Sequence, residues 1–426
     1  MPRTRPPDRI SPVTSLGGET HRQWLPTLQS ALRSWFRRQA RDLPWRRQCS
    51  PYAVWISEIM LQQTQVTAVI PYFRRFLARF PELSALASAD EEEVLRYWEG
   101  LGYYRRARQL HAAARQIVQH HQGQLPSTLG DLAKLPGIGR YTAGAIASIA
   151  YGIQAPILEA NTVRLWCRLA AIRSDPTRNA TQAELWRLAA LAARCDDPGL
   201  INQALMEVGS QICTPRAPKC DACPLAELCS ARQLGQQAKL PRPGRKTRYE
   251  EIREAAIVVQ DQGRYLLRKC RDGERWAGMW DFPRCPLEQL DHESASARRH
   301  LAQCCVQLTG AKTRIGPLFA TVKHGVTRFR ITLYCYHATP ADSSTVRSDS
   351  TTRWISPEEL ADLPLSVTGR KITRLLVPQG SNDRTKHVLS GHPNSKVAVS
   401  PAATDRVAAV AQRPGRRSNR ENPARS

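Results

Sequence analysis

Apolar residues recur at intervals of three and four along the first half of the chain, from Trp24 to about Leu234. That interval places them on one face of an α-helix, and the alternation typical of strands is scarce there. Proline and glycine interrupt the pattern and divide it into separate helices. The pattern therefore predicts an all-α domain, with amphipathic helices over residues 25–38, 91–102, 106–121 and 181–195.

The pattern changes beyond AKLPRPGRKTRYEEIRE, a segment rich in proline, glycine and charge that has the composition of a linker. Residues 253–260, 263–269 and 329–337 are β-branched or alternate between apolar and polar positions, as strands do. The sequence Asp-Gln-Gly at 261–263 precedes the second of these segments as a hairpin turn would. The second half is therefore expected to form a mixed α+β domain.

These changes divide the chain into five segments. We expect a disordered N-terminus, a helical domain, a linker, an α+β domain and a disordered basic tail, with bounds at 1–20, 21–235, 236–250, 251–378 and 379–426. The tail is polar and of low complexity, so it cannot bury enough apolar surface to fold.

Charge narrows the choice of partner. Lys and Arg outnumber Asp and Glu by 62 to 37, a formal net charge of +25. The tail carries only part of this excess, because residues 380–426 hold nine basic and three acidic residues. Such an excess favours a polyanion such as nucleic acid. No apolar run reaches the roughly 18 residues of a membrane span and no apolar leader is evident, so we expect a cytoplasmic, intracellular protein.

One carboxylate, Glu58, lies in the apolar stretch YAVWISEIML at residues 52–61. Two interpretations compete. Glu58 is either a solvated position on an ordinary helix or an acid kept protonated for chemistry. Apolar surroundings raise the pKa of a carboxyl group because they disfavour its anion. The stretch by itself favours the solvated position.

Four of the twelve cysteines lie within seventeen residues, CTPRAPKCDACPLAELC. Without an export signal a disulfide framework is not expected, so clustered thiolates indicate a metal site. Zinc sites usually pair two Cys-x-x-Cys knuckles and only one occurs here, whereas four thiolates in a compact loop also suit a [4Fe–4S] cluster. The spacing leaves zinc and iron–sulfur both open. The other eight cysteines show no ligand spacing and are interpreted as small buried apolar residues. The four candidate ligands are Cys213, Cys220, Cys223 and Cys229.

Two glycines, Gly137 and Gly139, stand between helical segments in LPGIGRYTAGAIASIA. Glycines at a helix N-terminus leave backbone N–H groups open to a phosphate. A Gly-x-Gly sequence occurs in many turns, but here Arg140 follows at once in a basic helical protein. The combination indicates a grip on a DNA backbone that does not read sequence.

Together, the glycine hairpin, the cysteine loop and Glu58 resemble the helix-hairpin-helix DNA glycosylases that carry an iron–sulfur cluster. The stretches LPWR, PYAVWISEIMLQQTQV, GLGYYRRAR, LPGIGRYTAGAIASIA and NQALMEVGSQIC cover most of residues 24–234 and resemble the adenine-specific MutY family. The resemblance implies a helix-hairpin-helix domain and a [4Fe–4S] cluster on the four cysteines. It also implies base excision repair of adenine mispaired with 8-oxoguanine or guanine in double-stranded DNA.

The family excises adenine from a nucleotide flipped out of the duplex, and the departing base must be protonated. The resemblance assigns this protonation to Glu58, and stabilisation of the cationic sugar to Glu159 with Asn161 beside it. Glu159 departs from the family's usual aspartate, and Ala160 from its glycine. Tyr141 stands where strand-cutting relatives have a lysine, so we expect little strand cleavage. A buried core tyrosine is the alternative.

The resemblance also places residues against DNA and the flipped base. Trp45, Arg46 and Glu207 would line the adenine pocket, although a core tryptophan and a surface arginine fit the sequence equally well. Side chains from two loops would fill the gap that the extruded base leaves. These expected wedge residues are Gln62, Gln63, Gly102 and Tyr103.

The α+β domain resembles the Nudix-like module of the same family through WAGMWDFPRC at 276–285. No Nudix hydrolase box occurs between 280 and 310, so we expect neither nucleotide hydrolysis nor a magnesium site. The family's lesion-reading loop aligns with KHGVTRFRI, where Thr327 replaces a serine and keeps a hydroxyl that can bond to a purine edge. Val326 and Arg328 replace a wedging phenylalanine and a second histidine.

Two other functions remain open from the sequence. An endonuclease III-like glycosylase with AP lyase activity is one, and Tyr141 and the second domain count against it. A damage-binding protein without activity is the other, and only Glu159 favours it. For the favoured enzyme we expect a monomer.

Overall fold

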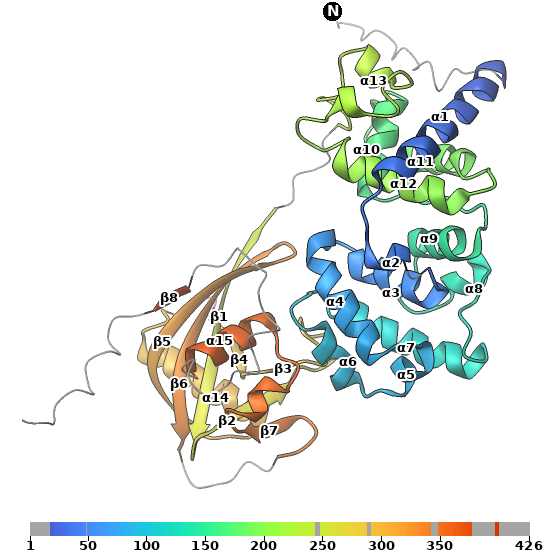
Figure 1. Cartoon of the computed structure of the whole chain (residues 1–426). Coiled ribbons are helices and arrows are strands. Elements are labelled where there is room, and N and C mark those ends of the chain that lie inside the picture. Colours follow the sequence, from blue (N-terminus) through green and yellow to red (C-terminus); the bar gives the residue numbers. More distant parts are fainter. Residues whose placement is uncertain are drawn as a thin grey trace, which may run out of the picture. The chain divides into compact units, whose positions relative to one another are not determined.

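Helices make up the first half of the chain, as the spacing of apolar residues predicts (Figure 1). They are α1 (Gly18–Gln39), α2 (Pro44–Arg47), α3 (Pro51–Leu61), α4 (Val66–Arg79), α5 (Leu83–Ser88), α6 (Glu91–Trp98), α7 (Arg105–His120), α8 (Leu129–Ala133), α9 (Arg140–Tyr151), α10 (Ala160–Leu169), α11 (Asn179–Ala192), α12 (Pro198–Gln211), the 3₁₀ turn η1 (Cys220–Ala222) and α13 (Ser230–Gln233). Among the described residues, no helix is both long and apolar enough to cross a membrane.

The computed structural model describes residues 18–47, 49–242, 248–287, 291–341, 348–376 and 397–399. Nearly all of the expected N-terminal disordered segment and of the basic tail lies outside these ranges. Two compact units emerge. The first combines the helical half with residues 267–281 and 355–376, and the second comprises 249–266, 282–354 and 397–399. The five segment bounds drawn from the sequence remain predictions.

Helix α3 is central rather than amphipathic. Ser50 caps it by accepting a hydrogen bond from the backbone N–H of Ala53 at 3.2 Å, and Pro51 occupies the first turn, where its missing N–H costs nothing. Every side chain from Ala53 to Met60 is buried, and α3 packs against α4, α7 and α9. A helix that is buried all round carries Glu58 into the interior.

Two glycines bring α9, α10 and α12 close together. A Cβ at Gly144 in α9 would lie 2.2 Å from the carbonyl oxygen of Pro156, in the segment that leads to Glu159. A Cβ at Gly209 in α12 would lie 2.9 Å from the Cβ of Asn161, at the start of α10. Only glycine permits both approaches, so these packing contacts fix where Glu159 lies relative to α9 and α12.

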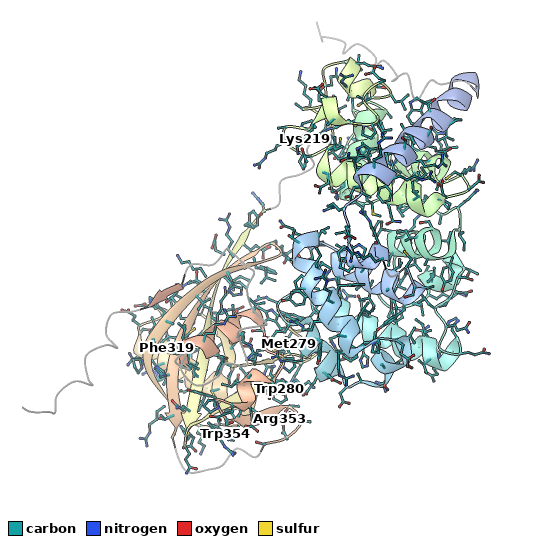
Figure 2. All side chains as sticks on the ribbon, viewed as in Figure 1. Lys219, Met279, Trp280, Phe319, Arg353 and Trp354 are labelled. Carbon is teal, nitrogen blue, oxygen red and sulfur yellow. A yellow bond between two sulfur atoms is a disulfide. The ribbon has the colours of Figure 1, made fainter. Side chains whose placement is uncertain are left out.

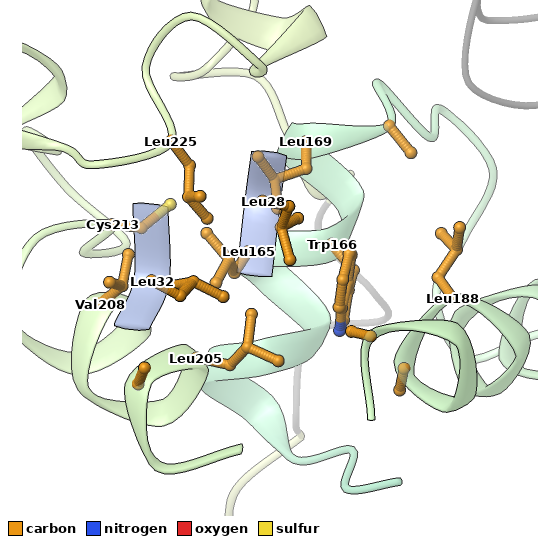
Figure 3. Close-up of a cluster of buried hydrophobic side chains, with 14 of the residues drawn as sticks. Leu28, Leu32, Leu165, Trp166, Leu169, Leu188, Leu205, Val208, Cys213 and Leu225 are labelled. Atoms are coloured by element: carbon orange, nitrogen blue, oxygen red, sulfur yellow. The ribbon is translucent and has the colours of Figure 1, made fainter. Parts of the chain in front are cut away.

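A hydrophobic cluster supports the base of the cysteine loop (Figure 3). It is built by α1, α10, α11 and α12, and Cys213 belongs to it with only 7% of its surface exposed. The first cysteine of the loop is therefore fixed by the core of the helical region. The labelled members include Leu28, Leu32, Leu165, Trp166, Leu188, Leu205, Val208 and Leu225.

The rest of the chain confirms the expected α+β character. Its elements are β1 (Glu250–Asp261), β2 (Arg264–Lys269), β3 (Trp280–Asp281), β4 (Arg284–Pro286), α14 (Ala295–Thr309), β5 (Thr313–Val326), β6 (Phe329–Pro340), β7 (Thr352–Ile355), η2 (Glu359–Ala361), α15 (Val367–Leu376) and β8 (Val397–Val399). β1 and β2 form the predicted hairpin, while β1 runs parallel to β6 and antiparallel to β4.

In the second unit, β6 also pairs antiparallel with β5, and α14 packs on the sheet. Ile257 of β1, Leu301 of α14 and Tyr336 of β6 share one apolar cluster there. Phe319, labelled in Figure 2, stacks on His337 of the neighbouring strand with ring centroids 4.2 Å apart. These contacts explain why the β-branched and aromatic stretches form a sheet.

Two cysteines correct the sequence interpretation. Cys285 in β4 and Cys304 in α14 form a disulfide, with Cα atoms 6.3 Å apart, within the usual range for a bridge. Cys49 is exposed rather than buried. The interpretation of all eight remaining cysteines as separate buried apolar residues was wrong, because the fold brings together two positions that the sequence spacing does not link.

Gly144→Ala should destabilise the helical region by about 1–3 kcal/mol, because the added methyl meets a backbone carbonyl that cannot move independently. Gly130→Ala in α8 is the matched control, since nothing lies within 4 Å of its added Cβ. That variant should be neutral or stabilising by roughly 0.5–1 kcal/mol. Urea unfolding followed by circular dichroism measures both. Equal stability of the two variants would contradict the tight packing at Gly144.

Candidate active site

Glu58 points inward from α3 and is only 5% exposed. The hydroxyl of Tyr141, in the first turn of α9, donates a hydrogen bond to Glu58 Oε2 at 2.8 Å. Glu58 is therefore a buried carboxyl group with one oxygen already occupied.

Burial raises the pKa of Glu58 to about 7, because its anion loses hydration. The hydrogen bond from Tyr141 lowers the pKa, the negative charge of Glu159 raises it, and the positive charge of Arg46 lowers it. Burial outweighs the two stabilising partners. The carboxyl group is consequently poised to give up or take up a proton near neutral pH.

Glu159 caps the N-terminus of α10. Its carboxylate accepts hydrogen bonds from the backbone N–H groups of Asn161 at 2.8 Å and Thr162 at 2.9 Å, and from the Asn161 side chain at 3.1 Å. The Thr162 hydroxyl completes a capping box with the Glu159 backbone. Burial outweighs these donors, so the pKa of Glu159 is raised above its ordinary value. The longer side chain is thus folded back onto its own helix.

Tyr141 joins three helices at the site. Besides its bond to Glu58, its hydroxyl lies 3.2 Å from the sulfur of Met206 in α12. Burial, followed by the charges of Glu58 and Glu159, raises the pKa of Tyr141 well above its ordinary value. Tyr141 therefore stays a neutral hydrogen-bond donor. Nothing in the sequence pattern singles out Met206.

Arg164 connects this site to the cysteine loop. Its guanidinium donates to the side-chain oxygen of Asn161 at 2.9 Å, to the carbonyl of Gly209 at 2.6 Å and to the carbonyl of Cys213 at 2.7 Å. This buried arginine therefore links Asn161, which binds Glu159, to the backbone of the first cysteine. Sequence reasoning missed Arg164, whose only signal is a basic residue on the inner face of a helix.

Glu207, placed by resemblance in the adenine pocket, is buried and paired with two arginines. Arg41 reaches its carboxylate at 2.7 Å and Arg46 at 2.9 Å. Burial works to raise its pKa, but the two guanidinium groups outweigh burial, so the pKa of Glu207 is lowered. Trp45 is buried with its ring edge-on to Phe73 at 5.4 Å. The sequence missed Arg41, and Arg46 is mostly buried rather than a surface residue.

The expected wedge residues occupy two loops. Gln63 and Tyr103 are exposed and have left-handed backbones, with φ of 55° and 51°, and Gly102 has φ of 79°. Positive φ values are uncommon for residues other than glycine. They persist only where contacts with the surrounding structure stabilise the loop. The Gln62 side chain is held in place, because its amide donates a hydrogen bond to the Thr142 hydroxyl at 3.2 Å.

The glycine hairpin lies between α8 and α9. Gly137 has φ of 77°, and Gly139 is the N-cap of α9, where space around the missing Cβ is open. The first N–H groups of α9 therefore lie at an accessible turn. Arg140, which begins α9, stacks its guanidinium 3.8 Å from the centre of the Trp186 ring. Trp186 was not predicted to take part.

Thr327 lies in the second unit, in the two-residue turn between β5 and β6. It is exposed, has a left-handed backbone with φ of 51°, and its hydroxyl donates to the carbonyl of Val326 at 2.7 Å.

The four cysteines at 213–229 are free of disulfides. Burial raises the pKa of Cys223 to about 12, against a hydrogen bond from the Leu225 backbone that lowers it, and the neighbouring thiolates raise it further. A bound cation would favour the thiolate form. The backbone N–H of Lys219, labelled in Figure 2, closes the loop by donating to the carbonyl of Ile212 at 3.0 Å. Arg168 donates to the Cys213 sulfur at 3.3 Å.

Four cysteine thiols in one loop are the donor set that a [4Fe–4S] cluster takes, with one thiolate for each iron. Cys213, the first of them, is fixed in the hydrophobic cluster. The donor set therefore fits an iron–sulfur cluster.

Three protein families match successive parts of the chain. Residues 56–190 match the HhH-GPD superfamily of base excision DNA repair proteins, and residues 213–229 match the iron–sulfur binding domain of endonuclease III. Residues 254–375 match the NUDIX domain. These matches confirm the helix-hairpin-helix region, the Nudix-like region and an iron–sulfur cluster as the cofactor.

Among characterised proteins, the chain is similar to several adenine DNA glycosylases. It is 33% identical to that of Mus musculus over 86% of this chain and 82% of the relative. It is 38% identical to that of Buchnera aphidicola subsp. Schizaphis graminum, over 59% of this chain and 72% of the relative. The Homo sapiens protein is 40% identical over 65% of this chain and 52% of its own length.

Replacing Glu58 with glutamine should stabilise the fold, and increasingly so as pH rises. The folded-state pKa of Glu58, about 7, lies above that of an unfolded glutamate, so stability is lost as pH rises from about 4.5 through 7. Glutamine avoids this loss because it has no proton to release. Thermal unfolding at about pH 5 and pH 8 should show a stability gain for Glu58→Gln of roughly 2–3 kcal/mol at the higher pH. A gain that does not change with pH would contradict the raised pKa.

Proposed function

Because the chain belongs to the adenine DNA glycosylase family, we propose that it hydrolyses the N-glycosidic bond of adenine mispaired with 8-oxoguanine or guanine in duplex DNA. The proposal includes action as a monomer and an intact DNA strand. The observation that carries this proposal is the buried Glu58, whose pKa of about 7 keeps a proton available at neutral pH.

Glu58 is the general acid of the reaction. Tyr141 donates to Oε2, which leaves Oε1 to carry the proton and to face a flipped adenine at N7. Protonation neutralises the charge that the departing base would otherwise develop. Once it has given up this proton, the Glu58 anion is a base that can activate the attacking water. The neutral Tyr141 hydroxyl stabilises the carboxylate at that stage.

Glu159 supplies the negative charge that faces the cationic sugar. Two backbone N–H groups and the Asn161 side chain hold the carboxylate, and each favours its anionic form. The two acids thus divide the chemistry. Glu58 is buried against the Tyr141 hydroxyl and holds a proton, whereas the donors at the N-terminus of α10 favour the anion of Glu159.

The remaining residues hold the substrate. The N–H groups at Gly139 and the start of α9, with Arg140 on Trp186, form a cationic grip for a DNA phosphate. Exposed Tyr103 and Gln63 enter the duplex where the adenine leaves. Trp45 and the ion pair of Arg46 with Glu207 would line the pocket for the flipped base.

The second unit and the cysteine loop have supporting roles. Thr327 presents its hydroxyl at an exposed turn that would meet the base opposite adenine. The residues that hold the cluster are Cys213, Cys220, Cys223 and Cys229. When bound, the iron–sulfur cluster cross-links these thiolates and stabilises the loop after α12. The Tyr141 hydroxyl, and not a lysine amine, lies against Glu58, so we expect little strand cleavage.

Purified protein incubated with a duplex holding one A:8-oxoguanine pair should release adenine, and the A strand should break only after alkali. Glu58→Gln should slow single-turnover excision by about 10²–10⁴-fold, because it removes the proton and keeps the shape. Binding in a gel shift should be unchanged, and exposed Glu82→Gln is the matched control. Cleavage without alkali would favour a lyase, and binding without release would favour a damage-binding protein.

Glu159→Asp should lower the excision rate by roughly 10- to 100-fold. Aspartate also caps a helix, so the fold should keep its stability, but the shorter arm moves the carboxylate by about 1 Å. Single-turnover kinetics and thermal unfolding separate the two effects. A faster Glu159→Asp enzyme would mean that glutamate weakens the site instead of being matched to it.

A further inference from the structure

Arg106, in the first turn of α7, is a buried cation without an acidic partner. It is only 8% exposed, and no carboxylate among the described residues forms an ion pair with it. Burying a charge costs several kcal/mol unless hydrogen bonds replace its hydration. The hydrogen-bond partners of Arg106 should therefore show which part of the structure the buried charge stabilises.

Five oxygen acceptors surround the guanidinium. Nη1 donates to the carbonyls of Ile59 at 2.8 Å, Met60 at 2.9 Å and Gln62 at 2.5 Å. Nη2 donates to the Thr64 hydroxyl at 3.1 Å and to the carbonyl of Gly102 at 3.1 Å. Four of these acceptors come from the end of α3 and the loop after it, and the fifth from the loop before α7.

The end of α3 needs such a cation. The last carbonyls of a helix have no partner within it and carry a partial negative charge. Arg106 satisfies two of them, only one and two residues beyond Glu58. It therefore fixes the last turn of the helix that carries the acid.

The same guanidinium reaches both wedge loops. Each loop exposes a side chain on a left-handed backbone, Gln63 in one and Tyr103 in the other. The carbonyl of Gly102, next to Tyr103, also accepts from the Trp98 indole at 3.1 Å. The Arg106 guanidinium lies 5.4 Å from the centres of both the Trp98 and the Tyr103 rings.

We propose that Arg106 is a positioning residue that locks the two loops into one preformed wedge, so that extrusion of the adenine does not have to order them. The inference rests on the proposed function, because it assigns these loops to base extrusion. Arg106 itself is buried and contacts no DNA. The planar guanidinium with its several N–H donors is essential, because the single ammonium group of a lysine cannot reach five acceptors on two loops.

Arg106→Lys tests whether the guanidinium positions the two wedge loops, because the substitution keeps the positive charge. A fluorescent 2-aminopurine at the position of the adenine reports extrusion without any chemistry, because its emission rises when it leaves the stack. With 2-aminopurine in a fully paired duplex, the variant should extrude the base roughly 10- to 100-fold less favourably than the parent protein. Arg115→Lys, an exposed substitution farther along α7, is the matched control and should leave extrusion unchanged.

A second duplex separates positioning from general damage to the fold. Where the 2-aminopurine faces an abasic-site analogue, extrusion requires little unpairing and depends less on a wedge. There Arg106→Lys should lie within about threefold of the parent. Equal losses on both duplexes, or no loss on either, would overturn the inference.

Thr64→Val keeps the test decisive if Arg106→Lys does not fold. It removes one acceptor of the guanidinium and leaves the buried charge in place. Extrusion from the paired duplex should weaken by roughly 3- to 10-fold, and unchanged extrusion would count against the lock. Failure of the proposed function is a separate result. In that case the parent protein releases no adenine from the A:8-oxoguanine duplex, whatever the variants do to extrusion.

Discussion

The site depends on one buried hydrogen bond, from the Tyr141 hydroxyl to the Glu58 carboxyl group. Burial makes ionisation of Glu58 costly, and the single donor recovers only part of the lost hydration, so the proton stays near neutral pH. With more donors, the group would be an ordinary carboxylate. With none, it would stay protonated too firmly to serve as an acid. The chemistry therefore follows from how few partners this carboxyl group has.

The raised pKa of Glu58 depends on how the helices pack around it more than on the catalytic residues themselves. Gly144 and Gly209 let α9 and α12 approach the chain on either side of Glu159, so that its charge acts on Glu58. Two buried arginines then hold neighbouring backbone in place through hydrogen bonds to carbonyl oxygens. Arg164 joins Asn161 to the cysteine loop, and Arg106 joins the end of α3 to both wedge loops.

The sequence predicted what is local and what is typical of the family. Helical periodicity and the hairpin at 261–263 require only neighbouring residues. The spacing of the cysteines indicated a metal site but left zinc and iron–sulfur both open, and the family resemblance decided for iron–sulfur. The cap on α10 was also visible in principle, because Thr162 follows Glu159 by three residues. Arg106, Arg41 and the Cys285–Cys304 bridge were not predictable, since each depends on partners far away in the chain.

In the folded protein, Glu58 is still protonated near neutral pH. Infrared difference spectra between the parent and Glu58→Gln, recorded across a pH titration, isolate the carbonyl band of this one carboxylic acid. We expect this band to disappear with a midpoint near pH 7. A band already lost at the pKa of an exposed glutamate, about 4.3, would contradict it.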